Sequence, residues 1–502
     1  MRSILITDYL DETIKKFPNN LAIVDEYTQI TYLELRDRAK SIASFIIERN
    51  IFKQPIVIMM GKSVQCISAF LGVAYSGNFY TPIDIKMPIS RIEKILETLN
   101  PAMIIIGKDC NSYSESEIFS KYPLIFYDNI FRKSFNESEI TAITNRIIDT
   151  DVLYVLFTSG STGVPKGVII NHRSVIDYIA WVVKTFDIKK EDRFGNQAPF
   201  YFDNSILDIY STLKTGSTMY IIPEKLFSFP IQLLTYLNEK KITIIFWVPS
   251  ALSIVANLKA VGKVEMTTLQ KVLFCGEPMP NKQLNMWRKA YPNLLYANLY
   301  GPTEITDVCT YYIVNREFED GESLPIGYPC ENTDIIVLNE KNQLVQEDEI
   351  GELCVRGTSL SYGYYNNTQK TEEAFVQNPL NKHYNEIIYR TGDLVKYNDY
   401  GELLYVSRKD FQIKHMGHRI ELGEIENAVN SLETVKSCCC IYDYSNSKIV
   451  LFYVADNEIK NLKKLLKYKL SDYMIPSKIN ILEQMPMNLN GKIDRNKLKE
   501  LL

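Results

Sequence analysis

The chain has 502 residues, too many for one ordinary hydrophobic core, so we expect at least two domains. It is 46% hydrophobic and 23% charged, with a formal net charge of -4; this is ordinary for a soluble globular enzyme and gives no basic surface for nucleic acid. No apolar run reaches the roughly 18 residues of a membrane span, and the N-terminus is unlike a secretory signal, so a cytoplasmic location is expected.

The chain has nine cysteines, an odd number spread over a long sequence, which is unlike a disulfide framework. Three of them, Cys438 to Cys440, are adjacent in a segment typical of a β-strand. Because neighbouring strand residues point to opposite faces of a sheet, these three make a poor metal cage. The four histidines form no HExxH pattern, so no structural metal is expected.

Short apolar runs alternate with helical patterns over most of the chain. Residues 31–50 and 89–100 have the pattern of helices. The apolar runs are continuous and β-rich, as buried parallel strands are, and lie at residues 54–60, 102–107, 152–157, 218–223, 243–249 and 271–276. This alternation predicts a layered α/β architecture.

The later segments change character. Residues 333–345, 351–357 and 401–417 are typical of strands joined by polar turns, which favours an antiparallel part. After about Lys409, the sequence predicts helices at 421–432 and 458–470 and strands at 438–444 and 448–455. These elements are enough for a small α+β domain at the C-terminus.

A loop rich in glycine and hydroxyl groups, TSGSTGVPKG, follows one of the predicted strands. Such a loop exposes backbone N–H groups that can surround a phosphate. Thr158, Ser159, Ser161 and Thr162 add hydroxyl donors, and Lys166 adds a cation. The GxxxxGK[ST] spacing of a P-loop is absent. The alternative is a solvated surface loop.

Four further motifs follow the loop in a fixed order: LYGPTE from Leu299, YRTGD from Tyr389, SRKDFQIKHMGHRIELGEIE from Ser407 and NGKIDR from Asn490. Together the five motifs closely resemble those of the adenylate-forming enzymes. That superfamily contains acyl-CoA synthetases, luciferases and the amino-acid adenylation domains of nonribosomal peptide synthetases. The resemblance covers essentially the whole chain.

The resemblance implies two domains and a hinge. We expect an N-terminal adenylation core, residues 1–408, made of layered α/β subdomains with a small β-barrel-like part. A small mobile α+β domain, residues 409–502, follows. In this family the C-terminal domain swings about a hinge, here Asp410, between adenylation and thioester formation. Lys492 would act in the first step, and residues 414–419 would face the site in the second.

In this family a carboxylate attacks the α-phosphorus of ATP, and pyrophosphate leaves. Charge develops on phosphate oxygens, so positioned donors, cations and Mg²⁺ matter more than acid–base groups. For catalysis the resemblance implies Thr303 at the α-phosphate, Glu304 at Mg²⁺ and Lys492 between substrate carboxylate and phosphate. For ATP binding it implies a phosphate loop, an adenine site and a ribose site. The loop residues are Thr158, Ser159 and Lys166. Gly276, Glu277 and Pro278 would line the adenine, Tyr300 would stack on it, and Asp393 and Arg408 would contact the ribose. Asn298 and Gly301 are further residues implied to bind ATP.

The segment FDNS resembles the FDxS motif of amino-acid adenylation domains, in which the aspartate pairs with the substrate α-ammonium group. Here that residue is Asp203. A buried carboxylate needs a cation, and an amino acid supplies one. The alternative role of Asp203 is a helix N-cap. Enzymes of the family that activate fatty or aryl acids generally lack this aspartate. The alternative to an amino-acid-activating enzyme is therefore an acyl-CoA or aryl-CoA synthetase. A non-enzymatic binding relative is a third.

Among amino-acid-activating enzymes, the segments NQAPFYFDNSILDIY and LFCGEPMPN resemble those of D-alanine–D-alanyl carrier protein ligases. Asn204 and Asp307 are polar where those ligases have apolar residues. Asp307 would either meet a hydroxyl or amine of the substrate or point away. Otherwise the predicted pocket is small to medium and mostly apolar. Its residues, lined up by motif, are Asp203, Asn204, Leu207, Phe246, Leu273, Cys275, Leu299, Asp307, Val308 and Lys492.

The chain ends at Leu502, shortly after the NGKIDR motif, with no room for a GxxS phosphopantetheine site. We therefore expect a free-standing ligase. It would activate a small amino acid with ATP and Mg²⁺ and transfer it to a separate carrier protein bearing phosphopantetheine. A monomer is expected, because it is the usual state in this family.

Overall fold

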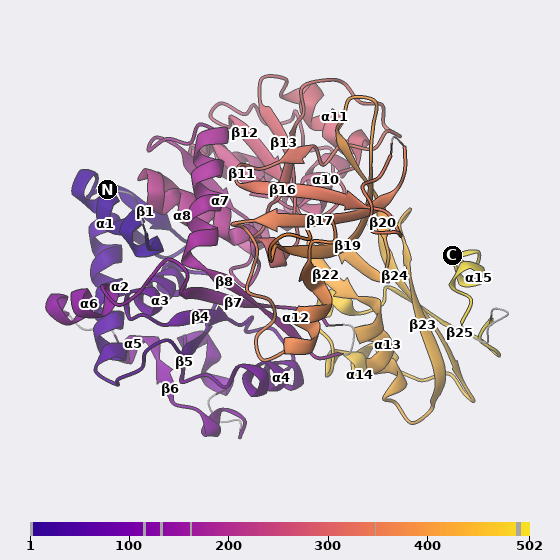
Figure 1. Cartoon of the computed structure of the whole chain (residues 1–502), viewed down its shortest axis with the longest axis horizontal. Coiled ribbons are helices and arrows are strands. Elements are labelled where there is room, and N and C mark those ends of the chain that lie inside the picture. The colour runs from indigo at the N-terminus through magenta and orange to yellow at the C-terminus, as the bar shows by residue number, and fades with distance from the viewer. Residues whose placement is uncertain (1–3, 114–116, 131–133, 161–162, 347, 488–492) are drawn as a thin grey trace. The chain divides into compact units, whose positions relative to one another are not determined.

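The computed structural model contains two compact units (Figure 1). The described residues are 4–113, 117–130, 134–160, 163–346, 348–487 and 493–502. The larger unit comprises Met1–Ile85, Asn100–Leu156 and Val168–Ser407. The smaller unit comprises Lys86–Leu99, Phe157–Gly167 and Arg408–Leu502. A large N-terminal α/β part and a small C-terminal part are therefore present, as predicted. The boundary between residues 408 and 409 stays a prediction.

Two sheets with mainly parallel strands build the larger unit. The first has the order β15 (Tyr328–Pro329), β14 (Thr310–Ile313), β13 (Leu295–Tyr300), β12 (Lys271–Phe274), β11 (Ile244–Trp247), β9 (Arg193–Asn196), β10 (Thr218–Ile221), β1 (Leu21–Val24) and β2 (Gln29–Thr31). The second has the order β6 (Leu124–Phe126), β5 (Met103–Ile106), β3 (Pro55–Met59), β4 (Phe79–Pro82), β7 (Val152–Thr158) and β8 (Lys166–Asn171).

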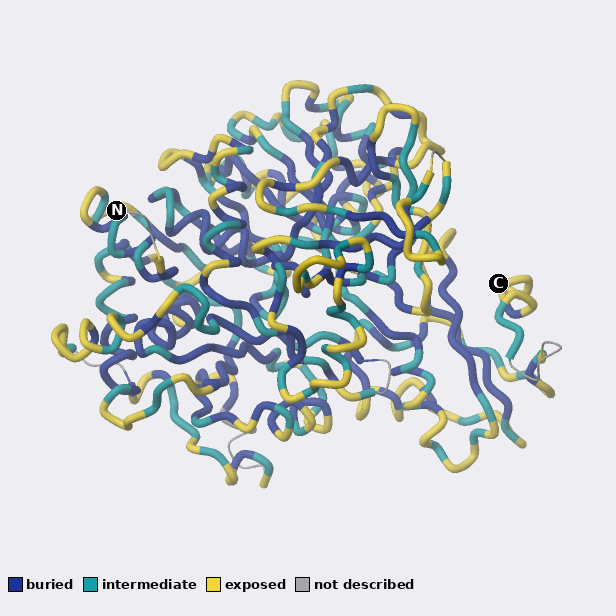
Figure 2. The backbone as a smooth tube through the Cα atoms, viewed as in Figure 1, coloured by how far each residue is buried: buried dark blue, intermediate teal, exposed yellow. Residues whose placement is uncertain are grey.

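Strand β11 shows why the larger unit has cores on both faces of its first sheet. Ile244 and Phe246 join one hydrophobic core, and Ile245 and Trp247 join another, because successive strand side chains point to opposite faces. Both faces are covered, so the strand is apolar throughout and dark blue in Figure 2. It pairs in parallel with β9 and β12, as the continuous apolar run predicted.

Helices cover the sheets and fill the two cores. The first core takes residues from α1 (Ile6–Lys16), α2 (Tyr32–Ile47), α3 (Val64–Tyr75), α5 (Tyr127–Ile130), α6 (Glu137–Thr144), α7 (His172–Thr185) and α8 (Asn204–Thr215). The second takes residues from α9 (Pro230–Glu239), α10 (Pro249–Asn257) and α11 (Asn281–Ala290). No helix among the described residues is both long and apolar enough to cross a membrane.

The antiparallel part that the sequence predicts is a separate sheet of the larger unit. Its pairing brings Glu352 opposite Leu394 and Gly351 opposite Val395. Helix α12 (Thr368–Ala374) precedes one of its strands. The strands are β16 (Thr333–Leu338), β17 (Gly351–Gly357), β19 (Ile387–Tyr397), β18 (Phe375–Gln377) and β20 (Leu403–Arg408).

The smaller unit is a mixture of helices and short sheets. Its helices are α4 (Ile89–Leu99), α13 (Leu422–Asn430), α14 (Leu462–Lys467) and α15 (Arg495–Lys499). Its strands are β21 (Gln412–His415), β22 (His418–Glu421), β23 (Val435–Asp443), β24 (Lys448–Ala455) and β25 (Lys478–Ile481). Helix α14 is shorter than the predicted 458–470, because Asn461 has a left-handed backbone, φ 61°, at its start.

All nine cysteines lie among the described residues, are buried and form no disulfide. The three neighbours on β23 alternate as predicted, since Cys438 and Cys440 join one core of the smaller unit and Cys439 joins another. The other six lie in the larger unit. Burial raises the pKa of Cys438 and Cys439 to about 12, which keeps these thiols protonated at neutral pH.

Candidate functional site

Asp203 stands immediately before helix α8 and is half-buried. Its Oδ1 accepts a hydrogen bond of 3.1 Å from the backbone N–H of Asn204. An ordinary N-cap side chain accepts from the second or third helical N–H instead, whereas Asn204 is the first residue of the helix. The residue therefore has the position of an N-cap without its usual bond. Its pairing with a substrate ammonium group stays a prediction.

The turn after β12 approaches the start of α8 closely. A Cβ atom on Gly276 would lie 3.9 Å from the side-chain nitrogen of Asn204, and the φ of 101° at Gly276 strongly favours glycine. The next residue, Glu277, accepts a hydrogen bond of 3.0 Å from the backbone N–H of Ser250 in the first turn of α10. The carboxylate of Glu277 therefore holds this turn against a helix N-terminus.

The predicted apolar pocket residues are buried together. They belong to one hydrophobic core and are Leu207, Phe246, Leu273, Cys275, Leu299 and Val308. Asp307 is buried beside them with 1% exposure, and its Oδ2 accepts a hydrogen bond of 2.7 Å from the hydroxyl of Tyr178 on α7. Burial and the charge of Asp307 hold the pKa of Tyr178 well above its usual value. Tyr178 stands in none of the motifs and was not among the residues predicted from the sequence.

The segment after β13 carries the predicted catalytic residues. Glu304 is fully buried in the short helical turn Thr303–Ile305, and its Oε1 accepts a hydrogen bond of 2.7 Å from the hydroxyl of Tyr364. Its backbone carbonyl accepts another of 2.9 Å from the N–H of Ser361. Tyr364 was also missed; the tyrosine-rich run Tyr362–Tyr365 was the only signal for it.

The chain folds back tightly around Gly301. A Cβ atom there would stand 2.3 Å from the carbonyl oxygen of Asp307, so only glycine fits. Just before it, the hydroxyl of Tyr300 donates a hydrogen bond to Oδ2 of Asp393 on β19, which is also buried. Asn298 donates a hydrogen bond of 2.8 Å from its side chain to the carbonyl of Pro325. The structure thus brings the predicted adenine and ribose residues Tyr300 and Asp393 together.

The predicted phosphate loop lies in the smaller unit. The hydroxyl of Ser159 donates a hydrogen bond of 2.7 Å to the carbonyl of Arg419, and Nζ of Lys166 lies 3.8 Å from Oε1 of Glu421. The hydroxyl of Thr158 makes a long contact of 3.5 Å to the carbonyl of Lys166. Lys492, Ser161 and Thr162 lie outside the described residues.

Asp410, the predicted hinge residue, forms an ion pair with Arg408. Nε and Nη2 of Arg408 donate hydrogen bonds of 2.6 and 2.8 Å to the two oxygens of Asp410. Although burial acts in the opposite direction, these bonds lower the pKa of Asp410. Arg408 thus contacts the hinge residue here, and its predicted contact with the ribose stays a prediction.

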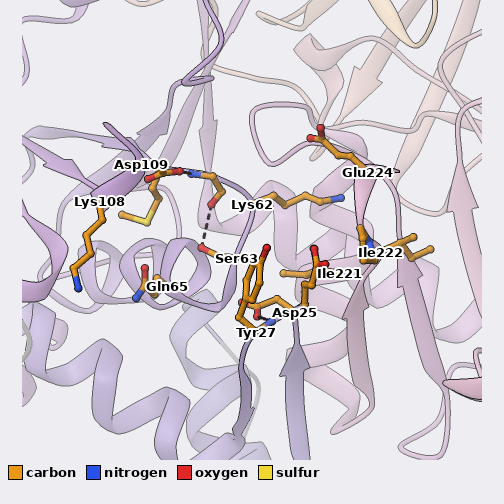
Figure 3. A pocket seen from close by; sticks show the side chains of 14 residues that line it. Asp25, Tyr27, Lys62, Ser63, Gln65, Lys108, Asp109, Ile221, Ile222 and Glu224 are labelled. Carbon is orange, nitrogen blue, oxygen red and sulfur yellow. Dashed lines mark hydrogen bonds between the residues drawn. The ribbon is translucent and has the colours of Figure 1, made fainter. Parts of the chain in front are cut away.

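A cavity of about 410 Å³ lies elsewhere in the larger unit (Figure 3). It contains Lys62 and Ser63 after β3 and Ile221 to Glu224 after β10, and none of the predicted site residues line it. Nζ of Lys62 donates a hydrogen bond of 3.0 Å to the carbonyl of Gln197. Burial lowers the pKa of Lys62 to about 8.

The half-buried Lys62 lies beside a polar pair that reaches α8, because its Nζ is 3.5 Å from the carbonyl oxygen of Asn196. Asp208, one turn after the start of α8, is fully buried, and its Oδ2 accepts a hydrogen bond of 2.8 Å from the side chain of Asn196. Burial raises the pKa of Asp208 to about 7, while the bond from Asn196 and the charge of Lys62 act against the rise. This pair supports the helix that follows Asp203.

The chain is similar to proteins of known function over nearly its whole length. Residues 10–365 match the AMP-binding enzyme family, and residues 424–492 match the AMP-binding enzyme C-terminal domain. Gramicidin S synthase 1 of Brevibacillus brevis is 32% identical over 99% of this chain, which spans 44% of that protein. The D-alanine--D-alanyl carrier protein ligase of Bacillus licheniformis is 31% identical, with 98% of this chain and 99% of that protein covered.

A solved structure has the same fold. The Vibrio cholerae adenylation domain AlmE, in complex with glycyl-adenosine-5'-phosphate, superposes with a TM-score of 0.84 at 22% identity, covering 100% of this chain and 98% of that one. The two family matches include the glycine-rich loop and LYGPTE, and the similarity to the D-alanine--D-alanyl carrier protein ligase covers 98% of the chain. The chain therefore belongs to the AMP-binding enzyme family, the adenylate-forming enzymes that its motifs resemble.

Proposed function

We propose that the protein activates an amino acid with ATP to an aminoacyl adenylate, releasing pyrophosphate. The phosphopantetheine thiol of a separate carrier protein then attacks the adenylate, so that a thioester forms and AMP leaves. Both steps are those that the resemblance of the five motifs to the family implies. The similarity to the D-alanine--D-alanyl carrier protein ligase, which covers nearly all of both chains, supports this choice over a coenzyme A ligase.

The position of Asp203 is the observation that carries the proposal. Its carboxylate is half-buried at the start of α8, one turn before Leu207 of the predicted pocket. It accepts from the N–H of Asn204 rather than from the helical groups that an N-cap normally satisfies. A carboxylate in this position is suited to the α-ammonium group of an amino acid, and a fatty or aryl acid offers it no cation.

The remaining residues have roles in orienting ATP. Tyr300 and Asp393, which are hydrogen-bonded to each other, would hold adenine and ribose. The buried carboxylate of Glu304 offers the hard oxygen ligands that Mg²⁺ prefers, and the hydroxyl of Tyr364 orients it. When bound, Mg²⁺ would neutralise charge on the phosphates. Lys492 would bring the substrate carboxylate towards the α-phosphate, so that attack needs no general base.

The test is amino-acid-dependent ATP–pyrophosphate exchange, measured over all L- and D-amino acids with ATP and Mg²⁺. Asp203→Ala should reduce exchange by about 100-fold or more, because it leaves the substrate ammonium group without its counter-ion. Asp187→Ala, an exposed carboxylate of the same unit, is the matched control and should have little effect. Exchange driven only by carboxylic acids without an amine, and unchanged by Asp203→Ala, would refute the proposal.

A further inference from the structure

Two buried polar groups near the predicted pocket have no hydrogen-bond partner among the residues that the structure describes. They are the hydroxyl of Tyr154 on β7 and the side-chain nitrogen of Asn204 on α8. Tyr154 is fully buried, and Asn204 is 7% exposed. Because an unsatisfied buried polar group is costly, native proteins contain few of them, and each needs an explanation. A ligand that pairs with them when it binds is one such explanation.

Both groups lie among the residues of the predicted pocket. Tyr154 belongs to the same hydrophobic core as Tyr178, Leu207 and Val308, the last of which follows Asp307 directly in the chain. Burial raises the pKa of Tyr154, and the charges of Asp203 and Asp307 act in the same direction. The nitrogen of Asn204 faces Gly276, where a Cβ atom would stand 3.9 Å away. Tyr154 does not appear in the motif-based list of pocket residues, and only the three-dimensional structure brings it there.

The carboxylate of Asp307 is fixed in place. Thr306 and Asp307 both have left-handed backbones, with φ of 61° and 74°, a conformation that is uncommon outside glycine. The hydroxyl of Thr306 donates a hydrogen bond of 2.8 Å to the carbonyl of Ser359, and that of Tyr178 donates one of 2.7 Å to Oδ2 of Asp307. Tyr178 is thus a positioning residue for this carboxylate.

We propose that the amino-acid substrate has a short side chain ending in a hydroxyl or an ammonium group, which binds Asp307 and the hydroxyl of Tyr154. This inference rests on the proposed function and names the class of amino acid. The buried side chains of Leu207, Leu299 and Val308 would enclose the alkyl part of the substrate. A purely alkyl side chain would leave the hydroxyl of Tyr154 unsatisfied in the complex.

The experiment compares matched amino acids in ATP–pyrophosphate exchange: serine with alanine, threonine with valine, and diaminobutyrate with norvaline. For at least one pair, kcat/KM should favour the polar member by about 10-fold or more, since sites built to bind a polar group reject analogues that lack it. Asp307→Leu should abolish or reverse this preference. Asp307→Asn distinguishes a hydroxyl substrate from an ammonium substrate. The variant should still use a substrate with a side-chain hydroxyl, because the amide can hydrogen-bond to it, but should lose activity with a side-chain ammonium group, because the counter-ion is gone.

Tyr154→Phe removes one oxygen atom and should reduce the preference without loss of folding. Tyr210→Phe is the matched control in the same aromatic cluster, because its hydroxyl is already paired with Tyr80 at 2.7 Å. It should leave the preference unchanged. A wild-type protein that favours the alkyl members, or a preference that survives both Asp307→Leu and Tyr154→Phe, overturns the inference while the proposed function stands. Exchange with no amino acid at all overturns both.

Discussion

The hydroxyl of Tyr364 donates a hydrogen bond of 2.7 Å to Oε1 of Glu304, a carboxylate that is completely buried. The two residues are 60 positions apart in the chain and come from different elements of the larger unit. A buried carboxylate is costly unless it is hydrogen-bonded or neutralised by a cation. The contact fixes the carboxylate that we expect to bind Mg²⁺.

Glu304→Gln should keep the shape of this side chain and remove its charge. We expect ATP–pyrophosphate exchange to fall by about 100-fold or more, because charge stabilisation of the phosphates is lost. Tyr364→Phe should act more weakly and raise the Mg²⁺ concentration needed for half-maximal exchange by about 10-fold. Titrations with Mg²⁺ at saturating ATP measure both effects. An unchanged Mg²⁺ dependence in both variants would contradict the role of Glu304.

Asp393→Ala should weaken recognition of the ribose. Wild-type protein should use ATP with a much higher kcat/KM than deoxyATP, since a carboxylate facing the ribose hydroxyls loses a partner with the analogue. The variant should discriminate less, with KM for ATP raised by about 10-fold and KM for the amino acid unchanged. Tyr300→Phe, which removes the hydroxyl that binds Asp393, should show the same trend more weakly. Equal discrimination in all three proteins would show that Asp393 does not contact the ribose.

Lys62 and the buried Asp208 should make stability depend on pH in two directions. Burial raises the pKa of Asp208 to about 7, so the folded protein retains a proton that an unfolded chain, with an Asp pKa of about 4, has released. Stability should therefore fall as pH rises from about 4 to about 7. The lowered pKa of Lys62, about 8, has the opposite sign, so stability should recover between about 8 and about 10.

The substitution Asp208→Asn should remove the fall in stability that the raised pKa of Asp208 causes. Lys62→Met should remove the recovery that the lowered pKa of Lys62 causes. The unfolding free energy of the Asp208→Asn variant should exceed that of wild type by an amount that increases between pH 4 and 7. The excess should reach at most about 4 kcal/mol. Urea unfolding at a series of pH values measures this difference. Parallel stability profiles for wild type and Asp208→Asn would show that Asp208 does not titrate in this range.

Lys492→Ala should separate the two steps of the proposed reaction. Exchange of pyrophosphate should fall by about 100-fold or more, because the lysine is expected to stabilise charge only during adenylation. Transfer from a preformed aminoacyl adenylate to a phosphopantetheine thiol should remain close to the wild-type rate. Lys497→Ala, a lysine of the adjoining helix α15, serves as the control. Loss of both steps in Lys492→Ala would contradict a role confined to the first.

Most of the fold follows from local sequence patterns. The run at 243–249 predicts a buried parallel strand because Ile244 to Trp247 are all apolar, and the structure confirms it. The helix predicted at 458–470 is shorter, because the left-handed backbone of Asn461 is not visible in the hydrophobic pattern. Local patterns therefore predict the type of an element better than its ends.

The residues of the candidate site also form two groups, those that stand in sequence motifs and those that do not. Asp203 and Glu304 stand in recognisable motifs, so the sequence alone identified them as candidates. Tyr178 and Tyr154 do not, because what distinguishes them is their place beside Asp307, which is 129 positions from Tyr178 in the chain. Tyr178 on α7 and Tyr154 on β7 become part of the site only through packing, because both lie in the same core as Val308, the residue after Asp307.

The burial of every thiol makes the cysteines a natural reporter of unfolding. A folded chain has no accessible thiol, so an alkylating reagent should label each cysteine only when the structure around it opens. Cys438 to Cys440 belong to the smaller unit and the other six to the larger one. Mass spectrometry of peptides alkylated over time would therefore give separate opening rates for the two units, without any engineered label.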